Sequence, residues 1–401
     1  MVHPLARDKD FSLLYDFCID SFNKYSGLVM ISMLTCVLLL VVYNSVTIFG
    51  TSAALRDSQT IQSFGDINVQ SKIVTGKRTF RIHWYNPPRY IKDHRKYAMS
   101  CGFETCRYSN CKMSYDRTDA NRSHAVIFDG RFMPPNLNFT RPDGQIWIFA
   151  AHEAPIHYYK GGDWWYKNKQ YTFNWTMTYN KDNTDIFLPY GEILKHKNEI
   201  KRNFKSLALS KNKTLLIITS RCQTDSKRME YVEELKKYVD VDVLGRCGKK
   251  WNCGIPHIHD DCFQILNTSY KFYLAFENSI CHQYFTEKFY ENFNYDLIML
   301  VRGGYKEEAK TLFPYIATAD FKSIEDLGTY LKNLSVDEYA ELLKRKSQFY
   351  SPSYSKVYQR ALCDICERMN NQNKYSKTIE NIKEWAFRSQ PCLQRENVTD
   401  V

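Results

Sequence analysis

The stretch from Tyr270 to Gly304 constrains the fold most, because it combines two apolar runs with a helix start between them. Residues 272–276 predict one strand, and residues 297–301 predict a second, buried strand that ends before a Gly-Gly pair. Between the two runs, Thr286 is of a residue type that commonly caps a helix N-terminus. A strand, a helix and a second strand in this order predict a βαβ unit.

A second unit of the same kind precedes this one, with strands predicted at 214–219 and 241–244. Between these strands, apolar residues at helical spacing predict a helix from about 227 to 238. Alternating strands and helices are typical of a Rossmann-like sheet. The chain has no G-x-G-x-x-G motif, so nicotinamide binding has no support.

The front half of the chain carries three further apolar runs, which predict strands at 79–84, 125–128 and 145–150. Glu153 follows the third run, and ligands bind at the loops that follow the strands of an α/β sheet. Glu153 therefore occupies a position where a catalytic group could lie. A solvated loop carboxylate is the simpler alternative when position is the only information.

Lys288 lies near the start of the predicted helix, where a cation opposes the helix dipole. A bound anion would explain this placement, because helix N-termini and lysines both bind phosphate. A solvated surface lysine is the alternative that position alone favours.

Residues 27–49 form an uncharged segment that is long enough to cross a bilayer. Basic residues are more frequent before this segment than after it, which favours a cytoplasmic N-terminus. We therefore expect a cytoplasmic tail over 1–26, a transmembrane signal anchor over 27–49 and a polar stem over 50–77. The bulk of the chain would then lie in a lumen.

Two features beyond this segment fit a secretory compartment. Eleven cysteines follow it, and in an oxidising lumen most of them should pair. Because that number is odd, at least one cysteine would stay free or pair with another chain. N-glycosylation sequons also follow the segment, at Asn121, Asn138, Asn174, Asn212, Asn267, Asn333 and Asn397.

The charge balance limits the partners of this chain. Its 401 residues suffice for two domains, and its formal net charge is +11. A basic protein can bind nucleic acid, an anionic membrane or an anionic small substrate. No run of five or more basic residues is present, so a nucleic-acid partner has little support.

Two motifs of the first unit described above, FYLAFENS and YFTEKFYENF, closely resemble the signature of the α1,3-fucosyltransferases, glycosyltransferase family 10. The resemblance implies that this segment binds GDP-fucose, with Glu287 at the ribose and Lys288 at the pyrophosphate. Arg228 aligns with a family arginine that contacts the pyrophosphate. The other donor-binding residues that the resemblance implies are Glu277 and Asn278.

The segment GQIWIFAAHEAP and the stretch from Asn174 to Gly191 resemble the acceptor-side signature of the same family. Glu153 matches the family's proposed general base, which removes the proton of the sugar hydroxyl. A partly buried carboxylate in this role is expected to have its pKa raised toward the working range. Further candidates for the donor and acceptor cleft are Tyr179, Asp185, Tyr190, Arg131 and Arg246.

Cys363 and Cys366 align with the family's late Cys-x-x-Cys, which implies a disulfide between them. A zinc site has little support, because no well-spaced second pair accompanies them. Asp240-Val-Asp242 has the spacing of a metal-binding Asp-x-Asp, but Asp242 lies inside a predicted strand. The sequence therefore demands no cofactor or metal, and the resemblance allows stimulation by Mn²⁺ or Mg²⁺.

The expected fold is α/β and GT-B-like, with two Rossmann-like domains facing a cleft and a single transmembrane helix before them. The expected boundaries are 78–205 for an acceptor-side domain, 206–370 for a GDP-fucose-binding domain and 371–401 for a C-terminal tail. The resemblance implies an inverting transfer of L-fucose from GDP-β-L-fucose to the 3-hydroxyl of GlcNAc in glycoprotein glycans, at the Golgi membrane.

Two other hypotheses stay open from the sequence. A membrane-tethered glycan-binding protein could keep the fold without catalysis, and a transferase could use another GDP-sugar. The acceptor is also open among core, LacNAc and LacdiNAc-type GlcNAc. Asp129-Gly130-Arg131 stands where vertebrate relatives often carry a His-His-Arg-like triplet that bears on acceptor choice.

Overall fold

The computed structural model describes residues 78–88, 91, 102–134, 136–161, 171–251, 260–304, 314–389 and 391–400. These residues lie within one compact unit, Gln70–Val401. None of the helices in these residues has both the length and the apolar character needed to cross a bilayer. The predicted cytoplasmic tail, transmembrane anchor and stem lie outside the described residues.

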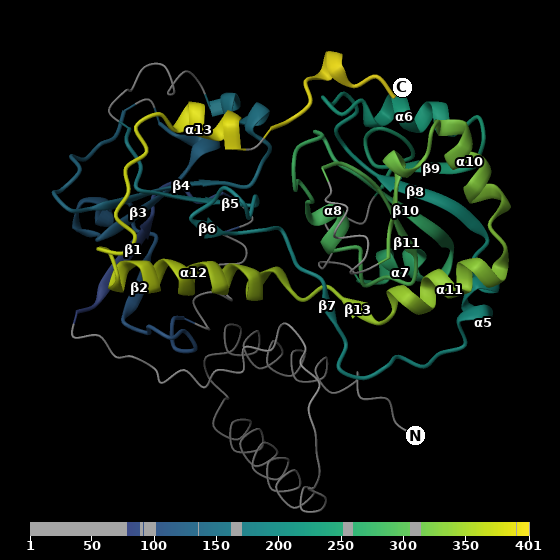
Figure 1. Cartoon of the computed structure of the whole chain (residues 1–401), viewed down its shortest axis with the longest axis horizontal. Coiled ribbons are helices and arrows are strands. Elements are labelled where there is room, and N and C mark those ends of the chain that lie inside the picture. The colour runs from purple at the N-terminus through teal and green to yellow at the C-terminus, as the bar shows by residue number, and fades with distance from the viewer. Residues whose placement is uncertain are drawn as a thin grey trace, which may run out of the picture. The chain divides into compact units, whose positions relative to one another are not determined.

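The first sheet contains six parallel strands in the order β2-β1-β3-β4-β5-β6 (Figure 1). It is buried on both faces: in β3, Ile127 packs into one hydrophobic cluster, whereas Val126 and Phe128 pack into another. An entirely apolar strand is typical of a parallel sheet that is covered on both sides. The strands are β1 Phe80–Trp84, β2 Cys111–Ser114, β3 Ala125–Asp129, β4 Ile146–Ala151, β5 Trp175–Thr178 and β6 Ile186–Phe187.

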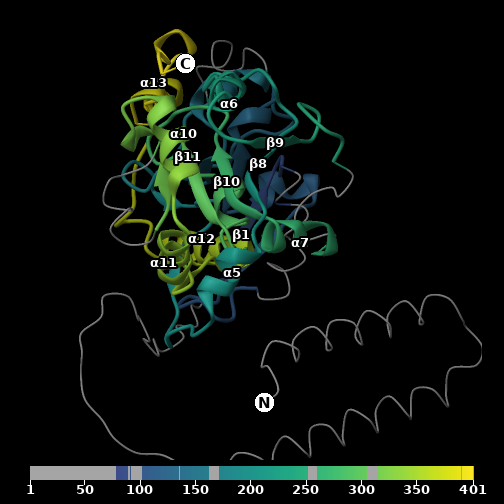
Figure 2. The ribbon, with the colours of Figure 1, turned by 90° about the vertical axis from the view of Figure 1, so that its right-hand side faces the viewer.

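The second sheet contains five parallel strands in the order β12-β11-β10-β8-β9. Helices α5, α6, α10 and α11 cover one face, and α7 and α8 cover the other (Figures 1 and 2). The strands are β8 Lys213–Ile218, β9 Val241–Leu244, β10 Tyr270–Phe276, β11 Ile298–Arg302 and β12 Ile316–Ala317. The helices are α5 Phe204–Ser210, α6 Arg228–Leu235, α7 Asp260–Thr268, α8 Glu287–Tyr290, α10 Ile324–Asn333 and α11 Val336–Lys346.

The order of the strands in the second sheet fixes where a ligand can bind. The chain passes from β8 outward to β9, and then returns to β10 on the other side of β8. The loops that follow β8 and β10 therefore diverge and leave a crevice at the carboxyl ends of these two strands.

All the strands predicted at the two βαβ units and in the front half form, within one or two residues of their expected ends.

Two late helices pack against the first sheet rather than the second. The buried face of α12 Tyr354–Asn370 joins the cluster of Ile127, and that of α13 Ile382–Ser389 joins the cluster of Phe128. A two-stranded antiparallel ribbon of β7 Leu194–Lys195 and β13 Phe349–Tyr350 lies where the chain passes between the sheets. The domain boundaries stay a prediction, and α12 lies in the segment expected to bind GDP-fucose.

The disulfide expected between Cys363 and Cys366 is wrong. Both cysteines form disulfides, but Cys363 pairs with Cys106 and Cys366 pairs with Cys111. The two residues lie three positions apart on α12, so they share the face of the helix that turns toward the first sheet. The Cys-x-x-Cys spacing suggested a disulfide within α12. Packing of α12 on the first sheet instead brings each cysteine next to a partner that is distant in sequence.

The asparagines of the sequons differ in exposure and in the hydrogen bonds that their side chains make. Asn121, Asn138, Asn212, Asn333 and Asn397 are exposed. The Asn174 side chain, in contrast, accepts a hydrogen bond from the Trp147 N–H (2.9 Å) and donates one to the Lys377 carbonyl (3.0 Å). The Asn267 oxygen accepts from the Asp296 N–H at 2.8 Å. These two amides are committed to packing in the folded chain.

Candidate functional site

A pocket of about 420 Å³ opens at the carboxyl ends of β8 and β10. This volume lies within the range of roughly 300–1,000 Å³ that is usual for small-molecule sites. Residues from both sheets line it: Glu153, Ile218, Thr219, Ser220, Arg221, Arg228, Arg246, Phe263, Tyr273, Asn278, Glu287, Lys288, Glu291 and Asn292. Six of the residues expected from the sequence therefore meet in one place.

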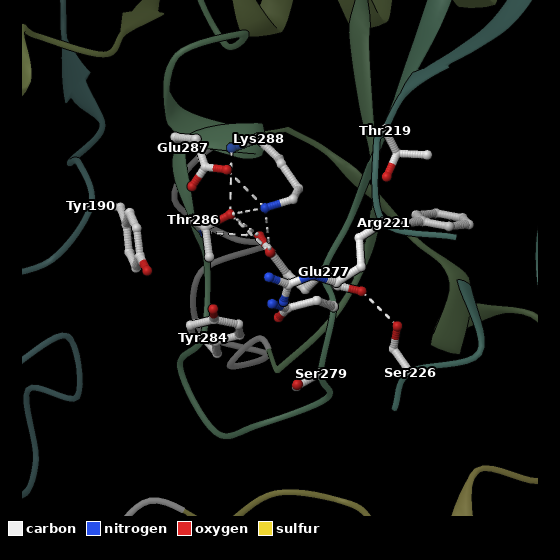
Figure 3. A network of polar contacts seen from close by, with 12 residues as sticks. Tyr190, Thr219, Arg221, Ser226, Glu277, Ser279, Tyr284, Thr286, Glu287 and Lys288 are labelled. Atoms are coloured by element: carbon white, nitrogen blue, oxygen red, sulfur yellow. Dashed lines mark hydrogen bonds and ion pairs between the residues drawn. The ribbon is translucent and has the colours of Figure 1, made fainter. Parts of the chain in front are cut away.

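Glu277 lies next to this pocket but does not line it. It follows β10, its side chain is 1% exposed, and its carboxylate accepts hydrogen bonds from the Thr286 N–H (2.8 Å) and hydroxyl (2.8 and 2.9 Å) (Figure 3). Burial raises the pKa of Glu277. The carboxylate thus fixes the residue that caps α8, and it can influence a ligand through Thr286 and Lys288.

Lys288 is held beside the pocket by two carboxylates. Its ammonium donates to Glu287 at 2.8 Å and to the Thr286 hydroxyl at 2.9 Å, and it lies 3.4 Å from Glu277. Burial lowers the pKa of Lys288, but Glu277 and Glu287 raise it more, so its pKa lies above the usual value. The predicted helix forms with Thr286 as its cap, but it is only four residues long. The charge of Lys288, rather than a helix dipole, is therefore the main attraction for an anion here.

Arg228 supplies a second buried cation, at the start of α6. Its guanidinium is 3% exposed and donates to the carbonyls of Phe276 (3.1 Å) and Arg221 (2.9 Å) and to the Thr219 hydroxyl (2.5 Å). These acceptors lie at the ends of β8 and β10, so the guanidinium bridges the two strands that border the crevice. Its Nε is buried and has no partner among the described residues.

Arg246 and Asn278 complete the polar wall. Arg246 Nε donates to the Ser220 carbonyl at 2.8 Å, which leaves its terminal nitrogens available to the pocket that it lines. The Asn278 side-chain oxygen is buried without a partner among the described residues, while its nitrogen lies 3.4 Å from Glu153. A buried oxygen of this kind is costly unless a ligand or water satisfies it.

Glu153 reaches the same pocket from the first sheet, directly after β4. Its carboxylate pairs with Arg131 at 3.0 Å and accepts from the Tyr284 hydroxyl at 3.2 Å. Arg131 belongs to a tight turn whose Gly130 leaves no room for a side chain, because a Cβ there would lie 2.1 Å from the Phe149 ring. The turn and the contact with Tyr284 aim one carboxylate from the front half at the crevice of the back half.

The expected rise in the pKa of Glu153 is wrong. Burial raises the pKa of Glu153, but the positive charges of Arg131, His157 and Lys288 together lower it by more. The net pKa therefore lies below the usual value. Glu153 is therefore ionised at neutral pH. The raised carboxyl is its neighbour Asp129, whose pKa burial lifts to about 6.

Four residues expected at the cleft do not line the pocket: Arg131, which pairs with Glu153, and Tyr179, Tyr190 and Asp185. Tyr179 is 2% exposed and packs its ring against Tyr284. Tyr190 stacks on His152 with ring centroids 4.6 Å apart and donates to its carbonyl at 2.8 Å. Asp185 accepts from the Thr176 N–H and hydroxyl, both at 2.9 Å, at the edge of the first sheet. The contacts of Tyr179 and Tyr190 support the surroundings of Glu153, whereas those of Asp185 support the edge of the sheet.

Several residues that line the pocket were not predicted from the sequence. Glu291 and Asn292 lie one helical turn beyond Glu287 and Lys288, and this i+4 spacing was a usable signal. Phe263 and Tyr273 come from α7 and β10, and nothing in their local sequence separates them from core aromatics. No cluster of His, Cys, Asp or Glu that could hold a metal occurs in the described residues. Asp242 lies in β9 as predicted, where it pairs with Lys213 at 2.9 Å.

Arg131→Met should move the acidic limb of the pH–rate profile to higher pH. If transfer needs ionised Glu153, the rate falls as the pH drops through the pKa of that carboxyl. Removing the cation that lowers this pKa raises it, so the rate should fall at a higher pH. Initial rates from pH 4 to 8 measure the shift, with Arg122→Met as a control at the exposed pair with Asp119. A limb that stays in place would show that Arg131 does not tune the ionisation on which the rate depends.

Comparison with known proteins decides the family. The description "Glycosyltransferase family 10 (fucosyltransferase) C-term" matches residues 208–385, and "Fucosyltransferase, N-terminal" matches residues 77–191. The chain belongs to glycosyltransferase family 10. The two matches contain the second and the first sheet respectively, so both sides of the pocket belong to family 10 sequence.

Individual relatives agree with this assignment. Glycoprotein 3-alpha-L-fucosyltransferase A of Drosophila melanogaster is 30% identical over 284 residues, which cover 68% of this chain and 53% of the relative. The chain thus spans about half the length of that protein. Alpha-(1,3)-fucosyltransferase C of the same organism is 29% identical over 343 residues, which cover 78% of this chain and 76% of the relative. A crystal structure of an α1,3-fucosyltransferase with GDP-fucose matches with a TM-score of 0.46 at 14% identity, over 76% of this chain and 94% of the other.

Proposed function

We propose that this chain is an inverting α1,3-fucosyltransferase that moves L-fucose from GDP-β-L-fucose to the 3-hydroxyl of GlcNAc in glycoprotein glycans. The observation that carries the proposal is the shared pocket: Glu153 from the first sheet lines it together with Arg228 and Lys288 from the second. Family 10 membership and the names of the relatives support the reaction class.

The donor's diphosphate fits the cations of the pocket. Arg228 and Lys288 would neutralise the two phosphates, with Arg246 near the same wall. Glu287, which holds Lys288 from the pocket side, is suited to the ribose hydroxyls. Ile218 and Phe263 offer an apolar surface to the base. No step of this scheme needs a metal, and stimulation by Mn²⁺ or Mg²⁺ belongs to the proposal as an optional effect.

The chemical step is a displacement at the anomeric carbon of fucose. The acceptor oxygen forms the bond to this carbon, the bond to the phosphate oxygen breaks, and its electron pair leaves with GDP. The proton of the acceptor hydroxyl passes to Glu153, whose lowered pKa keeps it ionised and able to accept. Arg228 and Lys288 stabilise the charge that grows on the departing diphosphate, and fixed charges of this kind are commonly worth about 3–4 kcal/mol each. Asn278, close to Glu153, is suited to orient the sugar.

Location and architecture form part of the same proposal. Residues 27–49 would anchor the chain in the Golgi membrane with its catalytic part in the lumen. The four disulfides of the described residues and the exposed sequons fit that compartment. The ranges 78–205 and 206–370, which contain the first and second sheets, would act as acceptor and donor domains of a GT-B-like enzyme.

Transfer of labelled fucose to a panel of glycans tests the function. The expected product carries fucose in α1,3 linkage on GlcNAc, and the panel identifies which of the core, LacNAc and LacdiNAc-type acceptors is used. A panel of GDP-sugars tests the donor at the same time. A protein that binds glycans without turnover would support the non-catalytic alternative, and transfer of another sugar would reassign the donor.

A further inference from the structure

Residues 391–400, here called the strap, cross from α13 on the first sheet to the loops that border the pocket on the second (Figure 1). Cys392 forms a disulfide with Cys281. On either side of this bond, the Leu393 N–H donates to the Ile280 carbonyl (2.8 Å) and the His282 N–H donates to the Pro391 carbonyl (3.0 Å). One end of the strap is thus fixed to the loop that begins with Asn278.

The other end of the strap is fixed to Arg302, at the end of β11. Asp400 accepts from both terminal nitrogens of this arginine, each at 2.6 Å. The guanidinium is 3% exposed, and it also donates to the Ser226 carbonyl at 3.0 Å. A buried cation needs a partner, because the cost of removing it from water is otherwise not offset.

Ser226 connects this arginine to the pocket. Its hydroxyl donates to the Glu277 carbonyl at 2.6 Å, and its N–H donates to the Asn278 carbonyl at 3.1 Å (Figure 3). Two residues later, Arg228 begins α6 and lines the pocket. Ser226 thus joins the loop after β8 to the loop after β10, and Arg302 contacts the Ser226 carbonyl.

The middle of the strap holds the same loop from a third direction. Lys227 donates to the Val398 carbonyl at 2.7 Å, and Arg395 donates to the Thr224 carbonyl and to Glu230. Lys227 has φ of 50°, a left-handed conformation that is unfavourable for a residue with a side chain unless its surroundings hold it. The strap supplies part of those surroundings directly before Arg228.

We propose that the strap is a positioning element of the donor site, in which Asp400 acts through Arg302 and Ser226 to hold Arg228 and Asn278 in the geometry that binds a diphosphate. This inference rests on the proposed function, since it assumes that GDP occupies the pocket. Asp400 itself lies outside the pocket lining and touches no ligand in this scheme.

Asp400→Asn in the full chain tests the strap. It keeps the shape but removes the charge that balances Arg302, so GDP affinity should fall about tenfold and the KM for GDP-fucose should rise accordingly. The KM for the glycan acceptor should change less, because the acceptor side is formed by Glu153 and Arg131 of the first sheet, whereas Asp400 pairs with Arg302 on the second. Glu384→Gln is the matched control, since it removes a carboxylate from an exposed ion pair with Arg388 on α13. Asp400→Glu should restore most of the affinity.

Three outcomes separate the claims. Wild-type GDP affinity in Asp400→Asn would overturn the positioning role and leave the proposed function intact. Equal rises in the KM for donor and acceptor would also overturn it, because they would indicate a general loss of folded enzyme. A wild-type protein that binds no GDP would overturn both the donor assignment and the inference that depends on it. Amide hydrogen exchange around Ser226 should accelerate in Asp400→Asn but not in Glu384→Gln.

Discussion

Replacing Glu153 with Gln should reduce fucose transfer by at least two orders of magnitude while leaving GDP affinity unchanged. General base catalysis is typically worth about 10²–10⁴-fold, and a side-chain amide cannot accept the proton. Gln keeps the volume of the side chain and can still accept hydrogen bonds from Arg131 and Tyr284. In the proposed site the diphosphate contacts come from the second sheet, so GDP affinity should not change. Turnover at saturating donor and acceptor, with GDP titration calorimetry, measures the two effects separately.

Asp129→Asn is the informative control for this experiment. Asp129 is a second buried carboxyl beside Arg131, and its pKa of about 6 would also suit a base near neutral pH. It lines none of the pocket that holds the cations, so its variant should keep most of the activity. Loss of turnover in Asp129→Asn together with normal turnover in Glu153→Gln would transfer the role of base to Asp129. Thermal unfolding of both variants shows whether the turn containing Gly130 has stayed folded.

The sequence predicted the strands well for a physical reason. Central strands of a parallel sheet are buried on both faces, so residues 297–301 are continuously apolar and stand out from the polar loops around them. The predicted site residues that line the pocket closely follow such strands, as Glu153 and Asn278 do. Their position at the carboxyl edge follows from the topology, and the family resemblance then selected them from other loop residues.

The predictions that failed all depended on contacts between distant parts of the chain. The pKa of Glu153 is set by Arg131 and Lys288, which lie in other segments, and burial alone gave the wrong sign. The partners of Cys363 and Cys366 lie about 250 positions away. Nothing in the sequence of 391–400 indicated that its carbonyls and Asp400 find partners on the second sheet.

Lys288→Met should weaken GDP binding by roughly 1.5–3 kcal/mol, or on the order of 10- to 150-fold, the usual value of a hydrogen bond to a charged group. In the proposed complex, Lys288 lies between the diphosphate and the carboxylates of Glu277 and Glu287, which lie within 3.4 and 2.8 Å of its ammonium. Without it, both carboxylates would face the phosphates with no cation between them. The loss should therefore lie toward the upper end of that range, and it should shrink as ionic strength rises.

Loss of GDP binding must be distinguished from damage to the fold, because Lys288→Met also leaves the buried Glu277 without its cation. The double variant Lys288→Met with Glu277→Gln removes that unbalanced charge and should recover thermal stability. It should recover at most the part of the GDP affinity that the unbalanced Glu277 removed, since the lysine is still absent. Lys236→Met, at an exposed pair on α6, controls for the general loss of positive charge. Wild-type GDP affinity in Lys288→Met would place the diphosphate elsewhere. Full recovery of GDP affinity in the double variant would mean that Lys288 serves the fold rather than the donor.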